Sequence, residues 1–156
     1  MKQLHRLLWI GIISIFLWGC NSKKGTFLET SISQNTQEVS VKKLQNLIKE
    51  NKLTLFNTID HAENAKSVKM RLKPETVVVF GNPKMGTVLM QCNPSMGLEL
   101  PLRILVSTNY EGTTSFTYTN PEYWSLKHNI KDKKCLAILY KAKVALSSLV
   151  QKASQK

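Results

Sequence analysis

The sequence lacks the short motifs that mark many catalytic and nucleotide-binding sites. It contains no Gly-x-x-x-x-Gly-Lys-Ser/Thr phosphate loop, no Gly-x-Gly-x-x-Gly turn, no Gly-x-Ser-x-Gly elbow and no His-Glu-x-x-His zinc motif. It also shows no internal repeat and no low-complexity segment. These absences remove the motif-based arguments for a nucleotide-dependent enzyme, a serine hydrolase or a zinc protease.

Acidic residues are scarce. The chain has 10 aspartate and glutamate residues against 22 lysine and arginine residues, a formal net charge of +12. Such a balance suggests nucleic acid, anionic lipid or an acidic partner. The segment 127–156 carries lysines but no arginine, whereas phosphate forks and base readout favour arginine. With no RNP, zinc-finger or helix-turn-helix signature either, we expect no nucleic-acid partner. A solvated basic surface is the expected use of these lysines, and contact with anionic lipid head groups is the alternative.

Long hydrophobic runs are absent except at the N-terminus. After Lys2 and Arg6, residues 7–18 are uncharged, which suits a signal-peptide core, whereas a membrane-spanning helix needs about 20 residues. The run ends in Leu-Trp-Gly-Cys at Cys20, similar to a bacterial lipobox. We therefore expect a lipoprotein signal peptide at 1–19, cleavage before Cys20, acylation of Cys20 with fatty acids such as palmitate, and a polar tether at 20–25. Because Asn21 is not the aspartate that retains lipoproteins at the inner membrane, we expect the outer membrane, facing the periplasm.

The remaining 26–156 is long enough for one modest domain. Apolar residues at helical spacing predict amphipathic helices, and alternating or β-branched runs separated by Gly, Asn and Pro predict strands. We expect an α+β fold, a two-layer sandwich with an antiparallel sheet and helices on one face. The expected strands are 26–33, 53–59, 77–81, 87–91, 103–108 and 113–119, with a turn at 82–85; the expected helices are 41–51, 62–72, 121–127 and 133–151. In outline the expected order is β-α-β-α-β-β-β-β-α.

Several short stretches together resemble one known family. They are Asp60-His61-Ala62, Phe80-Gly81-Asn82-Pro83, Gly86-Thr87, Leu89-Met90, Gly97-Leu98, Leu100-Pro101-Leu102-Arg103 and Asn120-Pro121-Glu122-Tyr123. This pattern resembles the bacterial and archaeal family catalogued as domain of unknown function 302, over roughly 26–130. The resemblance implies the same two-layer α+β fold. It implies no reaction, cofactor or substrate.

The chain has few histidine and cysteine residues, which limits the metal sites and nucleophilic catalysis that it could support. His61, next to Asp60, and His128 are the histidines outside the signal peptide. If the fold brings them together, they could act in acid–base or metal-assisted chemistry; otherwise His61 caps a helix or satisfies backbone groups. Cys92 and Cys135 remain after lipidation of Cys20, and their spacing leaves a disulfide open, because it does not give the distance between them.

The loop that contains Asn82, Pro83 and Gly86 could present backbone N–H groups to an anion, with Lys84 and Arg103 adding charge; alternatively these residues only make a turn. Met85, Met90 and Met96 could ligate copper(I), although methionine serves more often as core filler. We therefore expect a binding module without enzymatic activity that forms a homodimer. We expect it to hold a small ligand, metal ion or partner through residues Asp60, His61, Asn82, Arg103 and His128. An enzyme that uses Asp60 and His61, with His128, is the alternative.

Overall fold

The computed structural model describes residues 27–156. The predicted signal peptide, Cys20 and the tether lie outside the described residues. The elements follow in the order β1 (Leu28–Ile32), α1 (Gln37–Glu50), β2 (Thr54–Asp60), α2 (His61–Ser67), β3 (Glu75–Gly81), α3 (Pro83–Cys92), the 3-10 helix η1 (Pro94–Leu98), β4 (Leu102–Thr108), β5 (Thr114–Thr119), α4 (Glu122–Lys127) and α5 (Lys133–Ser154).

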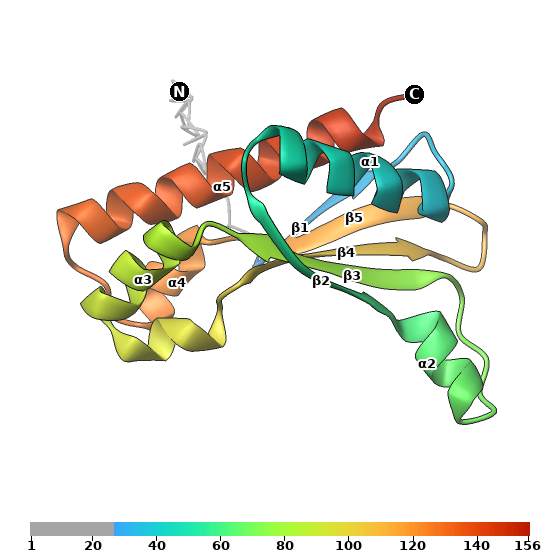
Figure 1. Cartoon of the computed structure of the whole chain (residues 1–156), viewed down its shortest axis with the longest axis horizontal. Coiled ribbons are helices and arrows are strands. Elements are labelled where there is room, and N and C mark those ends of the chain that lie inside the picture. The colour runs from blue at the N-terminus through green and yellow to red at the C-terminus, as the bar shows by residue number, and fades with distance from the viewer. Residues whose placement is uncertain (1–26) are drawn as a thin grey trace, which may run out of the picture.

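The strands form one five-stranded sheet in the order β1-β5-β4-β3-β2. Every neighbouring pair is antiparallel. Helices α1 and α5 lie together over one face, α2 extends from one end of the sheet, and α3 and α4 gather at the other end (Figure 1). The predicted α+β class, with an antiparallel sheet and helices on one face, is therefore confirmed.

The main core lies between the sheet and the two covering helices. Strand alternation turns every second side chain of β3, β4 and β5 toward the helices, where α1 and α5 present apolar stripes at helical spacing. The fully or nearly buried members are Leu44, Ile48, Val78, Phe80, Ile104, Val106, Phe116, Tyr118, Leu146, Leu149, Val150 and Ala153. A second cluster, built from α3, η1, α4 and the first turns of α5, extends this core beyond the end of the sheet.

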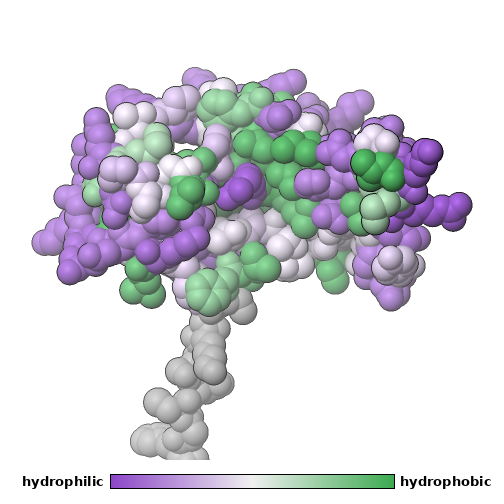
Figure 2. All heavy atoms as spheres, turned by 90° about the horizontal axis from the view of Figure 1, so that it is seen from below, coloured by the Kyte–Doolittle hydropathy of each residue, from purple (hydrophilic) through white to green (hydrophobic). Residues whose placement is uncertain are grey.

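The other face of the sheet is open. Ile59, Val77, Leu105, Thr117 and Thr30 lie side by side in register across all five strands on this face. Figure 2, which views the molecule from this side, shows hydrophobic residues across the middle and hydrophilic residues toward both ends. Among the described residues, no helix is both long enough and apolar enough to cross a bilayer.

The largest error in the sequence-based prediction is the hairpin at 77–91. The segment predicted as a turn and a strand, 82–91, is helix α3 apart from its capping residue. Asn82 caps this helix by accepting a hydrogen bond from the Met85 N–H at 3.2 Å, and Pro83 occupies its first position. Met85, Val88 and Leu89 then pack on the second core cluster at helical spacing. The Asn-Pro pair is thus a helix start and not a hairpin turn.

Smaller differences lie at the ends of helices. Helix α1 begins at Gln37, because Thr36 and not Ser40 provides the cap, accepting from the Val39 N–H. Ser40 is instead buried inside the helix, where its hydroxyl bonds Ser33 at 2.8 Å. Helix α2 ends at Ser67, short of the predicted 72, and part of the expected loop at 92–97 forms η1.

Candidate ligand cavity

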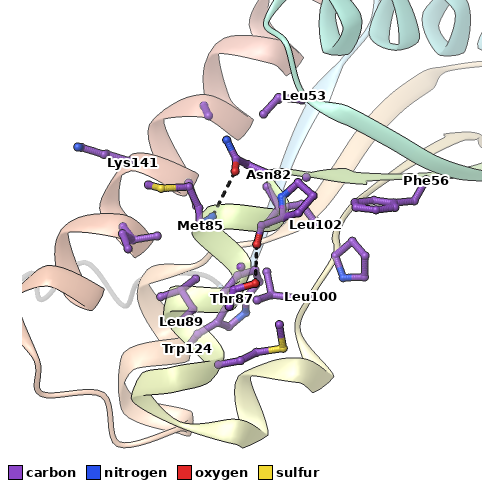
Figure 3. A pocket seen from close by; sticks show the side chains of 18 residues that line it. Leu53, Phe56, Asn82, Met85, Thr87, Leu89, Leu100, Leu102, Trp124 and Lys141 are labelled. Carbon is purple, nitrogen blue, oxygen red and sulfur yellow. Dashed lines mark hydrogen bonds between the residues drawn. The ribbon is translucent and has the colours of Figure 1, made fainter.

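An apolar cavity of about 420 Å3 lies between α3 and α5, at the end of the sheet where β3 passes into α3 (Figure 3). Its walls come from the end of β3, from α3, from the middle of α5, and from the chain segments that enter β2 and β4. The lining residues are Leu53, Phe56, Gly81, Asn82, Pro83, Met85, Gly86, Thr87, Leu89, Met90, Leu100, Pro101, Leu102, Trp124, Ile138, Lys141, Ala142 and Ala145.

Small residues keep this space open. Gly86 lies inside α3, and a Cβ built there would meet the Leu100 Cδ1 atom at 3.6 Å, an ordinary contact distance. On the opposite wall, Ala142 and Ala145 are three residues apart on α5 and so lie on one face of that helix. Short side chains on both facing helices leave a gap that larger residues would fill.

Most polar side chains of the lining form hydrogen bonds within the helix to which they belong. The Thr87 hydroxyl donates to the Pro83 carbonyl at 2.9 Å, and the Asn82 Oδ1 atom accepts from the Met85 N–H. Both bonds are drawn in Figure 3. Within residues 27–156, Lys141 is the one ionisable residue of the lining, and its amine extends outward from the cavity in this view. The cavity is therefore an apolar chamber with a basic residue at its rim.

Trp124 of α4 is among the residues that line the cavity (Figure 3). Its side chain is 4% exposed, and its indole Nε1–H has no hydrogen-bond partner. Within 27–156 it is the one buried side-chain nitrogen or oxygen atom without such a partner. A buried donor without an acceptor costs about 1–3 kcal/mol, and because less than 1 Å2 of this atom is accessible, neither solvent nor a molecule in the cavity supplies the missing bond.

A disulfide ties the two walls of the cavity together. It joins Cys92, the last residue of α3, to Cys135 near the start of α5. Asp132 lies close to both sulfurs and caps α5 by accepting from the Cys135 N–H at 2.9 Å. Two cysteines and a carboxylate are a plausible metal-ligand set by type, but sulfurs bonded to each other offer no thiolate. The cluster acts here as a covalent clamp between α3 and α5.

The structure does not bring Asp60 and His61 together with His128. Asp60 caps α2 by accepting from the Glu63 N–H at 2.9 Å, and His61 is the first residue of that helix. His128 follows α4, at the opposite end of the sheet (Figure 1). The shared acid–base or metal site that the sequence suggested therefore has no geometric basis in the described part of the chain.

His128 belongs instead to a buried polar network. Its Nε2 atom lies 3.0 Å from the Glu99 carboxylate, to which Lys127 also donates at 2.7 Å. Burial raises the pKa of Glu99, but the hydrogen bonds and charges of Lys127 and His128 outweigh burial and hold that pKa below its ordinary value. Glu99 is thus kept as a carboxylate that fastens the segment after η1 to α4.

The contact between His128 and Ser95 resembles half of a catalytic triad, with Ser95 Oγ 2.6 Å from His128 Nδ1. Ser95 Oγ also lies 2.9 Å from the Oδ1 atom of Asn93, whose Nδ2 donates to the His128 carbonyl. An amide oxygen only accepts, so the hydroxyl donates its single proton to Asn93 and itself accepts from His128. A histidine that donates to a serine is not positioned to remove its proton, and the network is structural.

Of the predicted ligand-binding residues, Asn82 lines the cavity and Arg103 does not. Arg103 is exposed on β4, beside Val79 on the open face of the sheet, where it donates to the Leu98 carbonyl at 3.4 Å. Met85 and Met90 line the cavity, whereas Met96 is fully buried in the second cluster. The sequence-based prediction did not include Trp124 or the α5 wall of the cavity. For that wall, the signal in the sequence was a pair of alanines within a stripe of larger apolar side chains.

Comparisons with known proteins identify the domain type. The family model described as "Domain of unknown function DUF302" matches residues 29–152. The crystal structure of an uncharacterized conserved protein DUF302 from Bacillus stearothermophilus superposes with a TM-score of 0.74, covering 83% of this chain and 99% of that one. At 16% sequence identity this likeness shows a shared fold and nothing more.

Curated relatives share part of their length with the chain. "Fluoride-specific ion channel FluC 1" of Brucella suis biovar 1 (strain 1330) is 31% identical over 100 residues, which are 64% of this chain and 37% of that protein. "Fluoride-specific ion channel FluC 2" of Brucella melitensis biotype 1 (strain ATCC 23456 / CCUG 17765 / NCTC 10094 / 16M) is also 31% identical over 100 residues, 35% of its length. The chain thus spans little more than a third of these relatives.

Proposed function

The chain belongs to the DUF302 family, and we propose that it is a binding module of the bacterial cell envelope that holds a small apolar ligand between α3 and α5. The observation that carries this proposal is the cavity described above. Its volume of about 420 Å3 falls within the range of roughly 300–1,000 Å3 that is usual for small-molecule sites. Since a water molecule occupies about 30 Å3 of liquid, the space suits a ligand of about a dozen non-hydrogen atoms.

The chemistry of the lining supports binding over catalysis. No aspartate, glutamate, histidine or cysteine is among the residues that line the cavity in the described part of the chain. General acid–base and nucleophilic catalysis both require a titratable or nucleophilic group within hydrogen-bond reach of the substrate. Thr87 has a hydroxyl, but Lys141, the one ionisable lining residue in the described part of the chain, extends its amine away from the cavity. What the cavity offers is apolar contact area, which favours retention of an apolar molecule.

The proposed membrane anchor would hold this cavity close to lipid. Cys20 precedes Phe27 by seven positions, with six residues between them, so the reach is at most about 25 Å. Phe27 contacts Tyr123 of α4, with ring centroids 4.3 Å apart, so the chain enters the domain beside the helix that carries Trp124. The relatives named above as ion channels also belong to a membrane setting. An acylated Cys20 would therefore place a site for apolar molecules next to the membrane, which is a source of such molecules.

Filling the cavity tests the proposal. Ala142→Phe places a ring into the α5 wall, and Ala137→Phe makes the same change at an exposed position of α5 outside the lining. Binding is read from the fluorescence of N-phenylnaphthylamine, an uncharged dye that brightens in apolar sites. We expect saturable binding to the wild-type protein and to Ala137→Phe, and at least tenfold weaker binding to Ala142→Phe. Equal binding by all three proteins would refute the proposal.

Mass spectrometry of the protein extracted from its native membrane supplies a second, independent test. The denatured mass reports cleavage before Cys20 and its acylation. A native mass that exceeds the denatured mass by one defined small species identifies the ligand, and that species should be absent from Ala142→Phe and present in Ala137→Phe. A species retained by both variants would place the bound molecule outside this cavity.

A further inference from the structure

We propose that the α2–β3 loop, residues 68–74, binds the surface of an anionic lipid bilayer. This inference is independent of the cavity and of any ligand in it. Three features of the loop carry it: large apolar side chains that the fold leaves exposed, basic side chains between them that have no acidic partner, and a backbone that is already held in place by hydrogen bonds.

The apolar side chains of the α2–β3 loop belong to neither core cluster. Val68 is 64% exposed, Met70 65% and Leu72 47%. Tyr110, 86% exposed in the turn between β4 and β5, lies beside the loop, with its ring centre 5.5 Å from the Lys73 Nζ atom. Single exposed apolar residues are normal, but several of them together among charged residues mark an interaction surface.

Basic residues alternate with these apolar residues along the loop. Lys69, Arg71 and Lys73 are all exposed, and none of them forms an ion pair with a residue that the structure describes. The loop itself contains no aspartate or glutamate. Its three positive charges are therefore available to an anionic partner.

Acidic residues near the loop in sequence do not neutralise it. Glu63 is paired with Lys66 at 2.8 Å, and Glu75 is half-buried at the start of β3. Glu111 follows Tyr110 in the neighbouring turn, which sets a single negative charge against the three positive charges of the loop. The surface formed by the loop and this turn thus remains basic.

Hydrogen bonds hold the loop in shape at both ends. The Met70 N–H donates to the Ala65 carbonyl at 2.8 Å, which continues the last turn of α2. The Thr108 N–H, at the end of β4, donates to the Pro74 carbonyl at 2.9 Å. Because the backbone is ordered before any partner arrives, binding costs little further conformational entropy, which favours association.

This combination favours a bilayer over a soluble anion. Each lysine or arginine near an anionic membrane surface strengthens binding about fivefold, and apolar side chains between them can enter the headgroup region. A soluble polyanion would pair with the cations and leave the apolar side chains in water. The loop also lies at the opposite end of the sheet from α4, which Phe27 contacts where the proposed anchor joins the domain (Figure 1). Attachment at both ends would lay the domain along the membrane.

Co-sedimentation with vesicles tests the proposal. The protein is the chain 20–156 with Cys20→Ser, which keeps every described residue and removes the proposed acylation site. Vesicles contain phosphatidylcholine alone or with about one third phosphatidylglycerol. We expect at least about tenfold tighter binding to the anionic vesicles, weakened by salt. Equal binding to both kinds of vesicle, or binding to neither, would overturn the proposal.

A matched pair of variants tests whether the loop is the binding site. The loop variant replaces its three cations: Lys69→Gln, Arg71→Gln and Lys73→Gln. The control variant replaces three exposed lysines at or beside α5: Lys131→Gln, Lys134→Gln and Lys152→Gln. We expect the loop variant to bind anionic vesicles at least about tenfold more weakly than the wild type, and the control less than about threefold more weakly. Similar losses in both would assign binding to net charge and overturn the loop as the site.

Insertion of the apolar side chains distinguishes a bilayer from a soluble anion. Met70→Trp places an indole in the loop, and Trp124, the one other tryptophan after residue 19, is buried. Phosphatidylglycerol vesicles that carry bromine on the acyl chains should quench the indole at position 70, whereas soluble polyglutamate should not displace the protein from them. Binding without quenching, together with displacement by polyglutamate, would overturn the proposal in favour of an acidic protein partner.

Discussion

The disulfide between Cys92 and Cys135 provides the most quantitative prediction. It closes a loop with a sequence separation of 43 residues and connects the end of α3 to the first turn of α5. In the chain-entropy description, a cross-link limits the conformations of the unfolded chain and so stabilises the folded state relative to it. For a loop of this length the expected contribution is about 4 kcal/mol at 25 °C.

The assay is urea unfolding of the mature protein with and without a reducing agent. Trp124 fluorescence reports the second core cluster beside the disulfide, and far-ultraviolet circular dichroism reports the whole domain. With a slope of about 1.5 kcal/mol per molar urea, loss of 4 kcal/mol should lower the midpoint by about 2 to 3 M. The same reducing agent should leave the midpoint of a Cys92→Ala/Cys135→Ala double variant unchanged.

Two results would refute this reasoning. A midpoint shift that corresponds to less than about 1 kcal/mol would show that the cross-link does not restrict the unfolded chain as the entropy description requires. Two free thiols after unfolding without reductant would show that the purified protein lacks the bridge. Agreement of the fluorescence and dichroism midpoints in reductant would show that the two core clusters still unfold as one unit, whereas an earlier fluorescence change would place the loss at α3 and α5.

Three further predictions concern the core, the buried network and α3. Leu146→Ala, at a side chain that is 1% exposed, should cost about 2–5 kcal/mol in urea unfolding, while Val144→Ala, half exposed on the same helix, should cost under about 1; equal losses would contradict the assigned core. Because the pKa of Glu99 is lowered in the fold, its carboxylate stabilises the protein above its unfolded pKa of about 4.3, and this contribution is lost as pH falls through the folded pKa. Glu99→Gln should therefore lose less stability than the wild type between about pH 5 and 3, and parallel curves would exclude the network as the cause. Gly86→Ala should raise the free energy of unfolding by about 0.5–1 kcal/mol, since the added Cβ meets Leu100 at an ordinary 3.6 Å and alanine favours a helix; destabilisation would show that α3 does not tolerate a side chain there.

Most of the fold could be predicted because its elements follow simple periodicities. Helix α5 shows an apolar stripe over many turns, and β5 alternates buried Phe116 and Tyr118 with half-buried Ser115 and Thr117. Such elements can be predicted from the local sequence alone. Helix α3 was missed because a β-branched and apolar run at 87–90 fits a strand as well as a helix, and the choice depends on what packs against it. The capping signal in Asn82-Pro83 was present in the sequence but equally suits a turn.

The candidate site was harder to predict because it exists only after the helices pack. Its two main walls, α3 and α5, begin 50 residues apart by their first residues Pro83 and Lys133. No local pattern shows that Gly86 and Ala142 face the same space. The histidine hypothesis failed for the opposite reason, since adjacent polar residues such as Asp60 and His61 look like a site in sequence but only begin a helix. Spacing likewise left the pairing of Cys92 and Cys135 undecided.

Ten of the 21 residues by which the chain resembles its family line the cavity. Gly81-Asn82-Pro83, Gly86-Thr87, Leu89-Met90 and Leu100-Pro101-Leu102 belong to both sets. Few of them are needed to fill the main core: of these ten, only Leu102 packs against it. The matching residues Gly86-Thr87 and Leu89-Met90 lie beyond the turn at Pro83 and line the cavity from α3, and Leu100-Pro101-Leu102 line it at the entry to β4. This overlap between the cavity and the matching residues makes ligand binding the property to test first.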